Sequence, residues 1–429
     1  MPAIQADPAA AREFAQVVVQ RLREAGHQAL WAGGCVRDEL LGRTPADYDV
    51  ATSARPVEVR EIFGKRRTLA VGAAFGVITV VGPKGAGQVE VTTFRTDEAY
   101  TDGRHPAGVT FCSAEEDAKR RDFTINGLFL DPATGEVLDY VGGREDLVRG
   151  VVRAIGVPSL RFGEDHLRML RAVRFAAVFG FVLDAATREA VERLCHFVRT
   201  VSPERVAAEL RLMVSRNGRR RALELLSQTG LAREVLPEVS PGGDGPMTDE
   251  GWRQASAIID ALDEPDLPMA IATLVEREGE RGEAAHKLVL AIARRLRLSN
   301  AEAKLAGWLC AGVASLEEGG MGGIENRPWS TLQPWLAHDD AFRLADLLRA
   351  RADLGFGRTE TAAWVTRQLE RPRHELDPPP LLSGDDLLAM GLAEGKLVGG
   401  LLKSLRQRQL DGELSSRDAA IAFVRTQMG

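Results

Sequence analysis

Hydrophobic positions follow a helical period at the start of the chain and a strand period soon after it. The first stretch places apolar side chains three and four residues apart, at Phe14, Val17, Val18 and Leu22. Asp7 can cap this helix, Pro8 suits its first turn, and Gly26 can end it. The pattern therefore predicts one amphipathic helix near the N-terminus.

Short runs rich in β-branched residues then predict strands. The expected strands lie at 27–31, 77–81, 89–94, 128–130 and 137–140. Turn-forming residues at 82–87 and 131–135 join the last four into two hairpins. Strand signals stop after Gly156, and helices separated by short loops are expected from Glu164 to the end. We therefore predict an α+β chain, with a small N-terminal α/β domain and a long helical extension.

Composition narrows the class of protein. A chain of 429 residues is too long for one ordinary domain, and its 45% apolar and 27% charged residues are typical of soluble proteins. No apolar run approaches the roughly 20 residues that span a bilayer, and the first residues show no secretory signal, so neither a membrane nor secretion is expected. The cysteines are far apart, which argues against disulfides or a zinc site and favours the cytoplasm: Cys35, Cys112, Cys195 and Cys310.

The net charge of −6 does not by itself indicate a nucleic-acid-binding protein. Positive charge is nevertheless local, because residues 199–221 contain seven arginines against two acids, Glu204 and Glu209. Such a stretch is compatible with RNA binding and equally with a solvated helix face.

The first group of chemically informative residues is Gly33, Gly34 and Arg37, followed by Asp47 and Asp49. Two glycines at a strand-to-helix junction let backbone N–H groups approach a phosphate. In an Asp-x-Asp pair on a strand, both carboxylates face the same side, and a hard cation such as Mg²⁺ would neutralise them. Each piece alone suits a tight turn or an acidic loop, but together they favour a phosphate-and-metal site.

Glu90 is the candidate for a third carboxylate. It alternates with Val89 and Val91, which should face the core, so its side chain points the other way. An ordinary exposed glutamate on a strand explains the same pattern, and both interpretations stay open.

A second group lies in a charged helix that is expected to run into a strand. Arg120 and Arg121 can meet phosphates, while Asp122 and Asn126 can meet ribose hydroxyls. Surface salt bridges would account for the same charges. Neither a GxxxxGK[ST] phosphate loop nor a GxGxxG fingerprint occurs in the chain.

A third group is Asp165 and Arg168, three residues apart on an expected helix and therefore on one face. An acceptor beside donors can read the Watson–Crick edge of a base. The alternative is an ordinary helix salt bridge with a basic face, which is the commoner arrangement.

Taken in order, these segments resemble the class II tRNA nucleotidyltransferases and bacterial poly(A) polymerases of the polymerase-beta-like superfamily. The resemblance covers residues 31–210 and is carried by WAGGCVRDELLGRTPADYDVAT, VEVTTFRTDEAYTDGRHPAGVTF, RRDFTINGLFL, DYVGGREDL, RFGEDHLRMLRAVRFA and SPERVAAEL. It implies a catalytic head over 1–155, a neck over 156–240, a body over 241–330 and a tRNA-binding tail over 331–429. It also implies that 97–106 forms the flexible loop linked to the change from C to A addition.

The resemblance implies roles for particular residues. Asp47 and Asp49 would bind Mg²⁺. The triphosphate would be held by Gly33, Gly34 and Arg37, and the nucleotide sugar or phosphate would be contacted by Arg121 and Asp122. Asp165 and Arg168 would hydrogen-bond the incoming CTP or ATP in place of a nucleic-acid template. Further phosphate contacts would come from the same helix, at Arg171 and Arg174.

The expected activity is addition of the 3′-terminal CCA to tRNA from CTP and ATP. Three alternatives are a poly(A) polymerase, a specialist adding only CC or only A, and a non-catalytic RNA-binding protein on the same scaffold. The sequence lacks a long basic C-terminal extension, which disfavours the polymerase, and an intact Asp47–Asp49 pair disfavours the non-catalytic protein.

Overall fold

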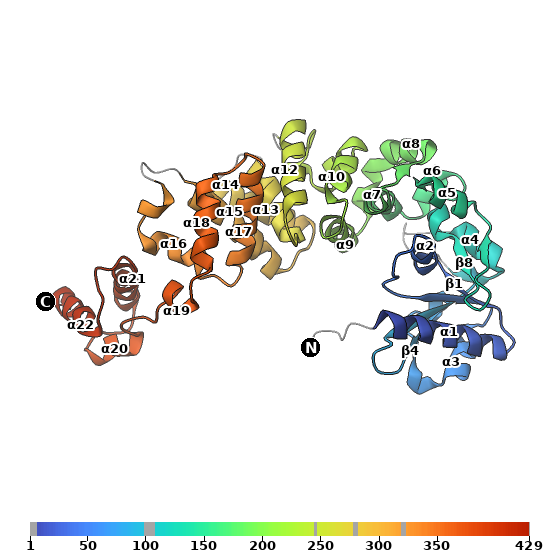
Figure 1. Cartoon of the computed structure of the whole chain (residues 1–429), viewed down its shortest axis with the longest axis horizontal. Coiled ribbons are helices and arrows are strands. Elements are labelled where there is room, and N and C mark those ends of the chain that lie inside the picture. The colour runs from blue at the N-terminus through green and yellow to red at the C-terminus, as the bar shows by residue number, and fades with distance from the viewer. Residues whose placement is uncertain (1–6, 98–107, 244–246, 278–281, 319–322, 429) are drawn as a thin grey trace. The chain divides into compact units, whose positions relative to one another are not determined.

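The computed structural model describes residues 7–97, 108–243, 247–277, 282–318 and 323–428. The predicted flexible loop at 97–106 falls, from residue 98 onward, outside these residues. The chain divides into two compact units, Met1–Asp244 and Gly245–Gly429. The first holds the sheet and the second is helical, which agrees with the predicted α+β class (Figure 1).

A seven-stranded sheet organises the first unit, with the strand order β3-β4-β5-β2-β1-β8-β9. Only β2 and β5 are parallel, and every other neighbouring pair is antiparallel. Both predicted hairpins are present, as β4–β5 and β8–β9. The strand bounds are β1 Ala29–Ala32, β2 Asp49–Thr52, β3 Thr68–Leu69, β4 Val77–Val81, β5 Gln88–Thr93, β8 Leu128–Leu130 and β9 Val137–Asp139.

The predicted N-terminal helix is α1, Pro8–Glu24, and Asp7 caps it by accepting a hydrogen bond from the Ala9 amide at 3.1 Å. The predicted apolar stripe is only partly right. Val18 and Leu22 are buried, but Val17 is 43% exposed, and the rest of the buried face is formed by Ala15 and Val19. The buried face of α1 is therefore rotated from the predicted one, and it includes small and β-branched residues that pack on the sheet.

Helices cover both faces of the sheet. On one face lie α1 and α3, Pro56–Phe63 (Figure 1). On the other lie α2, Gly34–Leu40, and α4, Ala114–Arg120, whose alanines pack on Phe94 and Phe129. Along the chain between β5 and α4, residues 95–97 and 109–111 form the small antiparallel ribbon β6–β7.

The rest of the first unit is mostly helical. The prediction that strands stop after Gly156 is wrong at one point, since Val182–Leu183 (β11) pairs in parallel with Val151–Val152 (β10). The remaining elements are the 3-10 turn η3 Thr124–Asn126 and α5 Gly143–Arg149, α6 Pro158–Glu164, α7 Leu167–Phe179, α8 Ala185–Leu194, η4 Cys195–Thr200, α9 Pro203–Val214, α10 Arg219–Gln228, α11 Leu231–Val235 and η5 Pro237–Val239.

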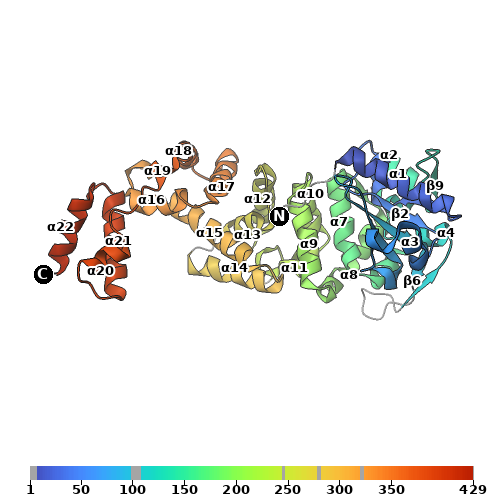
Figure 2. The same ribbon diagram turned by 90° about the horizontal axis from the view of Figure 1, so that it is seen from below.

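The second unit consists of helices, and buried charge ties several of them together. Arg351 of α17 is 3% exposed and bonds to Glu276 of α13 and, at 2.7 Å, to Glu317 of α15. Near the C-terminus, α20 to α22 enclose a small apolar core of their own (Figure 2). The helices are α12 Asp249–Ala261, α13 Leu267–Arg277, α14 Glu283–Arg295, α15 Asn300–Glu317, α16 Trp329–Leu336, α17 Ala341–Asp353, α18 Thr359–Leu369, α19 Arg373–Leu376, α20 Gly384–Ala389, α21 Lys396–Leu410 and α22 Arg417–Met428.

Two expectations concern covalent chemistry and membranes. All four cysteines are free. Among the described residues, no helix has the length and apolar character needed to cross a bilayer.

Two glycines at the ends of α7 and α10 differ in the space around them and give a test of packing. Both have positive φ, 70° at Gly180 and 83° at Gly218, so alanine at either costs about 1–2 kcal/mol in backbone strain. A Cβ at Gly218 would also lie 2.3 Å from the backbone oxygen of Ala177, whereas one at Gly180 meets nothing within 4 Å. We expect Gly218→Ala to lower the melting temperature clearly more than Gly180→Ala in calorimetry. Equal shifts in melting temperature would show that the backbone of α7 moves to accommodate the added Cβ without a free-energy cost.

Candidate functional site

A cavity of about 620 Å³ opens where α2, the start of β2, η3 and the neighbouring helices meet. Thirteen of the fourteen residues predicted from the sequence line it, and Glu90 is the exception. The thirteen are Gly33, Gly34, Arg37, Asp47, Asp49, Arg120, Arg121, Asp122, Asn126, Asp165, Arg168, Arg171 and Arg174. The three sequence groups therefore meet in one place.

The backbone at Gly33 permits the closest approach in this cavity. Gly33 has φ +72° and precedes α2, a conformation that residues with a Cβ rarely adopt. A Cβ there would lie 2.8 Å from Nη1 of Arg121. Glycine is therefore required both for the turn and for the position of the arginine.

The carboxylate pair lies at the start of β2, but only Asp49 belongs to the strand, since Asp47 stands just before it. Burial, together with the negative charges of Asp47 and Glu90, raises the pKa of Asp49 to about 7, against a smaller lowering by Arg121. Gathered carboxylates with so little compensation fit a divalent cation.

Glu90 is placed beside this pair rather than inside the cavity. It is the cross-strand neighbour of Asp49, and it is exposed while Val89 and Val91 are buried, as the alternation predicted. Within the described ranges, no group of three or more His, Cys, Asp or Glu side chains forms a metal-binding cluster. The arrangement suits a cation held by two carboxylates and completed by phosphate oxygens and water.

Acidic and amide side chains form hydrogen bonds to the arginines that line the cavity. Arg37 donates to Asp38 at 2.9 Å and to Asn126 at 2.6 Å, and its guanidinium stacks 4.5 Å from the ring of Phe179. Arg121 donates to Asp117, which is fully buried, at 3.0 Å. Both guanidinium groups are therefore fixed before any ligand arrives.

The side chain of Asp122 is largely buried, with 11% of its surface exposed, and its carboxylate is hydrogen-bonded. Its carboxylate accepts hydrogen bonds from Asn126 at 3.0 Å and from Arg171 at 2.8 Å. Burial alone would raise the pKa of Asp122, but the charge of Arg171 and these two hydrogen bonds outweigh it and lower the pKa to about 2. Residues 124–126 form a 3-10 turn rather than the expected strand, which turns Asn126 back toward Asp122.

The placement of Asp165 on a helix is wrong. It lies in extended conformation between α6 and α7, where its side chain accepts a hydrogen bond from the Leu167 amide at 3.1 Å. Its partner is Arg205 of α9, at 2.7 and 3.2 Å, rather than Arg168. A carboxylate that caps the first turn of α7 cannot also lie within that turn.

Arg168 and Arg174 have acidic partners of their own on neighbouring elements. Arg168 donates to Glu164 at 2.5 Å, and Arg174 donates to the buried Glu209 at 2.6 Å. Only part of the positive charge of Arg174 is therefore left for a ligand.

Six lining residues were not among the sequence candidates for this site: Asp38, Ala46, Leu167, Phe175, Arg205 and Arg216. The basic stretch at 199–221 was the signal for Arg205 and Arg216, although it did not say which arginines face the cavity. Arg199 instead bonds to Glu234 at 2.5 Å, and Arg220 bonds to Glu224 at 3.1 Å. Arg216 is exposed and has no hydrogen-bond or ion-pair partner among the described residues.

The charge of the lining as a whole is positive. Eight arginines face five aspartates around the cavity. A surplus of fixed guanidinium groups beside a carboxylate pair suits a polyphosphate that arrives with a metal ion.

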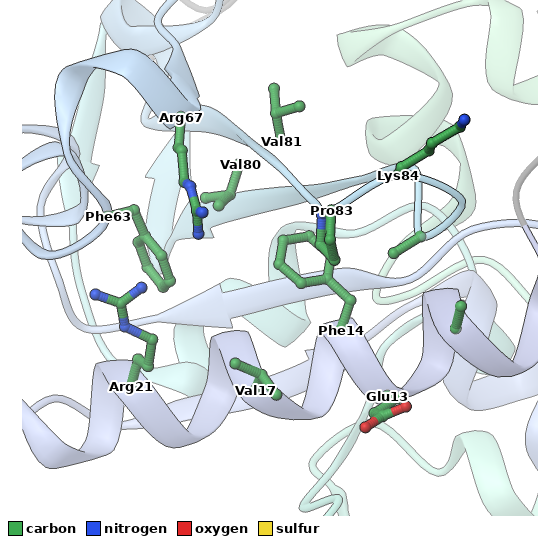
Figure 3. Close-up of a pocket in the computed structure, with 12 residues that line it drawn as sticks. Glu13, Phe14, Val17, Arg21, Phe63, Arg67, Val80, Val81, Pro83 and Lys84 are labelled. Atoms are coloured by element: carbon green, nitrogen blue, oxygen red, sulfur yellow. The ribbon is translucent and has the colours of Figure 1, made fainter.

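A second cavity, of about 330 Å³, lies between α1 and β4 and contains none of the predicted residues. Phe14, Val17 and Phe63 face it, with Arg21 and Arg67 beside them (Figure 3). Most of its lining is apolar, although Glu13 and Lys84 also border it.

The fold and the cavity together define a nucleotidyltransferase head. Residues 29–153 match the family described as "Poly A polymerase head domain", and residues 180–242 match "Probable RNA and SrmB-binding site of polymerase A".

Similarity extends over the whole chain in one relative, the CCA-adding enzyme of Enterococcus faecalis (strain ATCC 700802 / V583), which is 33% identical over 426 residues, 96% of this chain and 95% of that protein. This chain belongs to the family of CCA-adding enzymes.

Two further comparisons add detail. The CCA-adding enzyme of Bacillus subtilis (strain 168) is 45% identical over 219 residues, so the match spans 51% of this chain and about half the length of that relative, 54%. The crystal structure of the Bacillus stearothermophilus CCA-adding enzyme in complex with CTP is similar with a TM-score of 0.77 and 30% identity, covering 97% of this chain and 98% of that one.

The lowered pKa of Asp122 predicts a pH-dependent contribution to stability. An unfolded aspartate has a pKa of about 3.9, so the ionised carboxylate stabilises the fold above that value and loses its effect as the pH falls toward 2. The difference amounts to about 2–3 kcal/mol. We expect Asp122→Asn to lower the melting temperature strongly at pH 7 and about half as much at pH 3.

Glu115→Gln is the control for this experiment, because Glu115 is exposed and pairs with the equally exposed Lys119 along α4. A gap between wild type and Asp122→Asn that stays constant from pH 7 to pH 3 would contradict the assigned electrostatics.

Proposed function

We propose that this protein adds the 3′-terminal CCA to tRNA from CTP and ATP without a nucleic-acid template. The observation that carries the proposal is the Asp47–Asp49 pair facing an arginine-lined cavity in a member of this family. We also propose Mg²⁺ as the cation, because hard oxygen ligands and nucleotide phosphates are its usual partners.

In the proposed reaction, the terminal 3′-hydroxyl of tRNA attacks the α-phosphorus of CTP or ATP. The bond between that phosphorus and the bridging oxygen breaks, pyrophosphate leaves, and the hydroxyl proton is lost. Mg²⁺ held by Asp47 and Asp49 would acidify the hydroxyl and neutralise charge on the leaving oxygens. Arg37 and Arg121 would orient the triphosphate, and their fixed positions avoid the cost of ordering them during the reaction.

Base selection is proposed for Asp165 and Arg168. Cytosine and adenine both present an amino donor next to a ring-nitrogen acceptor, whereas uracil and guanine present an oxygen acceptor next to an N–H donor. A carboxylate that accepts and a guanidinium that donates match the first pattern and oppose the second. Arg205 and Glu164 would keep the two side chains in place while the base binds.

The wider organisation is part of the proposal. The head over 1–155 would carry the chemistry, the neck over 156–240 would read the base, and the body and tail would hold the tRNA by its shape and phosphates. Glu90 would act beside the catalytic pair through its charge, and Arg171 and Arg174 would steady the nucleotide. Four free cysteines support the cytoplasm as the compartment.

A direct assay tests the activity. The protein is incubated with Mg²⁺, labelled CTP or ATP, and tRNA ending before CCA, after C or after CC. We expect three discrete additions in the order C, C, A, and a loss of at least about a thousandfold in rate for Asp47→Asn, because several kcal/mol of transition-state stabilisation depend on the metal.

Glu115→Gln, on the exposed side of α4, should leave this activity unchanged. Long A tails on any RNA would favour a poly(A) polymerase. Addition that stops after CC, or A addition alone, would favour a specialist. No incorporation by the wild-type protein would remove the enzymatic proposal.

Selectivity tests the base-reading pair. Asp165→Asn replaces an acceptor oxygen by an amide donor, so we expect kcat/KM for CTP to fall about tenfold to a hundredfold while that for UTP falls less. Glu224→Gln is the matched control, since Glu224 also pairs with an arginine of this region but lies outside the cavity. Parallel losses for CTP and UTP would mean that Asp165 supports the fold rather than reads the base.

A further inference from the structure

Tyr48 stands between the two carboxylates but faces away from the cavity that they line. Its side chain is 4% exposed, and its ring packs on that of Trp31 in β1, with centroids 4.8 Å apart. Trp31 is fully buried. The ring of the residue between Asp47 and Asp49 is therefore fixed against the sheet, and both aspartates are its direct neighbours in the chain.

The hydroxyl of Tyr48 reaches a second element. It donates a hydrogen bond of 2.7 Å to Oε1 of Glu39, in the last turn of α2. The same oxygen accepts a hydrogen bond of 2.9 Å from Nε of Arg12 in α1, and the Arg12 guanidinium lies 5.2 Å from the centre of the Trp31 ring. One carboxylate oxygen thus joins α1, α2 and the segment that bears the catalytic pair.

Glu39 lies on the same short helix as the residues proposed to bind the phosphates. The N-terminal end of α2 is formed by Gly33 and Gly34, and Arg37 lies two residues before Glu39 on the same helix. A helix of seven residues moves as one body, so a contact at Glu39 also fixes the backbone that faces the phosphates.

We infer that Tyr48, through Glu39, is a positioning residue that sets the distance between the Asp47–Asp49 pair and the phosphate-binding end of α2. The inference rests on the proposed function. Neither side chain touches the substrate, and their effect is to hold the two halves of the site in register. Displacements of about 1 Å in such a site reduce the rate of group transfer far more than they reduce binding.

Tyr48→Phe removes only the hydroxyl and keeps the ring against Trp31. We expect kcat for CTP addition to fall about threefold to tenfold, as befits one hydrogen bond, with KM for CTP unchanged within about twofold. In a second measurement without substrate, Mn²⁺ titration followed by electron paramagnetic resonance should show weaker binding to the variant. Glu39→Ala should reproduce both changes, and the double variant should be no worse than Glu39→Ala alone.

Two variants separate positioning from general stability. Glu39→Gln keeps an oxygen for the Tyr48 hydroxyl and should stay close to wild type in kcat and in Mn²⁺ affinity. Tyr140→Phe removes a hydroxyl that has no hydrogen-bond partner in the described part of the chain, at a ring that is 39% exposed, and it should change neither quantity.

Two outcomes overturn the inference. One is a Tyr48→Phe protein that melts at a lower temperature yet keeps wild-type kcat and Mn²⁺ affinity. The other is an equal loss in Tyr140→Phe. Failure of the proposed function looks different, because then the wild-type protein itself incorporates no CTP, while the Mn²⁺ titration still compares the variants.

Discussion

Repulsion between like charges at the start of β2 is the constraint around which the first unit is built. Asp49 is held beside Asp47 and near Glu90 in a place that water reaches poorly, and its pKa of about 7 expresses the free-energy cost of keeping that charge there. A protein without a use for this arrangement would gain stability by replacing one of the acids. The fold tolerates this unfavourable free energy because β2 is an interior strand, hydrogen-bonded to β1 on one side and to β5 on the other.

Around this negative centre, a further set of acids and amides holds several of the positive groups. Asp117 holds Arg121, Asp38 and Asn126 hold Arg37, and Glu164 holds Arg168. Long arginine side chains are costly to immobilise, and here that cost is met during folding rather than during binding. Asp117 is fully buried and does not line the cavity, yet it matters to the site as much as Arg121, which it holds.

Local patterns predicted the parts of the molecule that depend on local physics. The hairpin of β4 and β5 follows from alternation and a glycine-rich turn, and the outward position of Glu90 follows from the same alternation. The cavity could be anticipated from residue types at short spacing. The partner of Asp165 could not, because Arg205 is forty residues away and their meeting depends on how α7 packs against α9. The prediction that Val17 belongs to the buried face of α1 was wrong for a related reason. Packing against the sheet determines which side of the helix is buried. The roles of the individual site residues remain predictions, because contacts alone do not show what each does.

If Asp165 reads the base as proposed, its bidentate pair with Arg205 would make base selection an exchange of hydrogen-bond partners. Both carboxylate oxygens of Asp165 are already bonded to Arg205, so a base would have to share or replace that partner. An amino group on the base would replace the hydrogen bonds that Asp165 loses. A base without an amino group would leave the Arg205–Asp165 pair as the more stable arrangement, and such a base would be rejected without any movement of the protein.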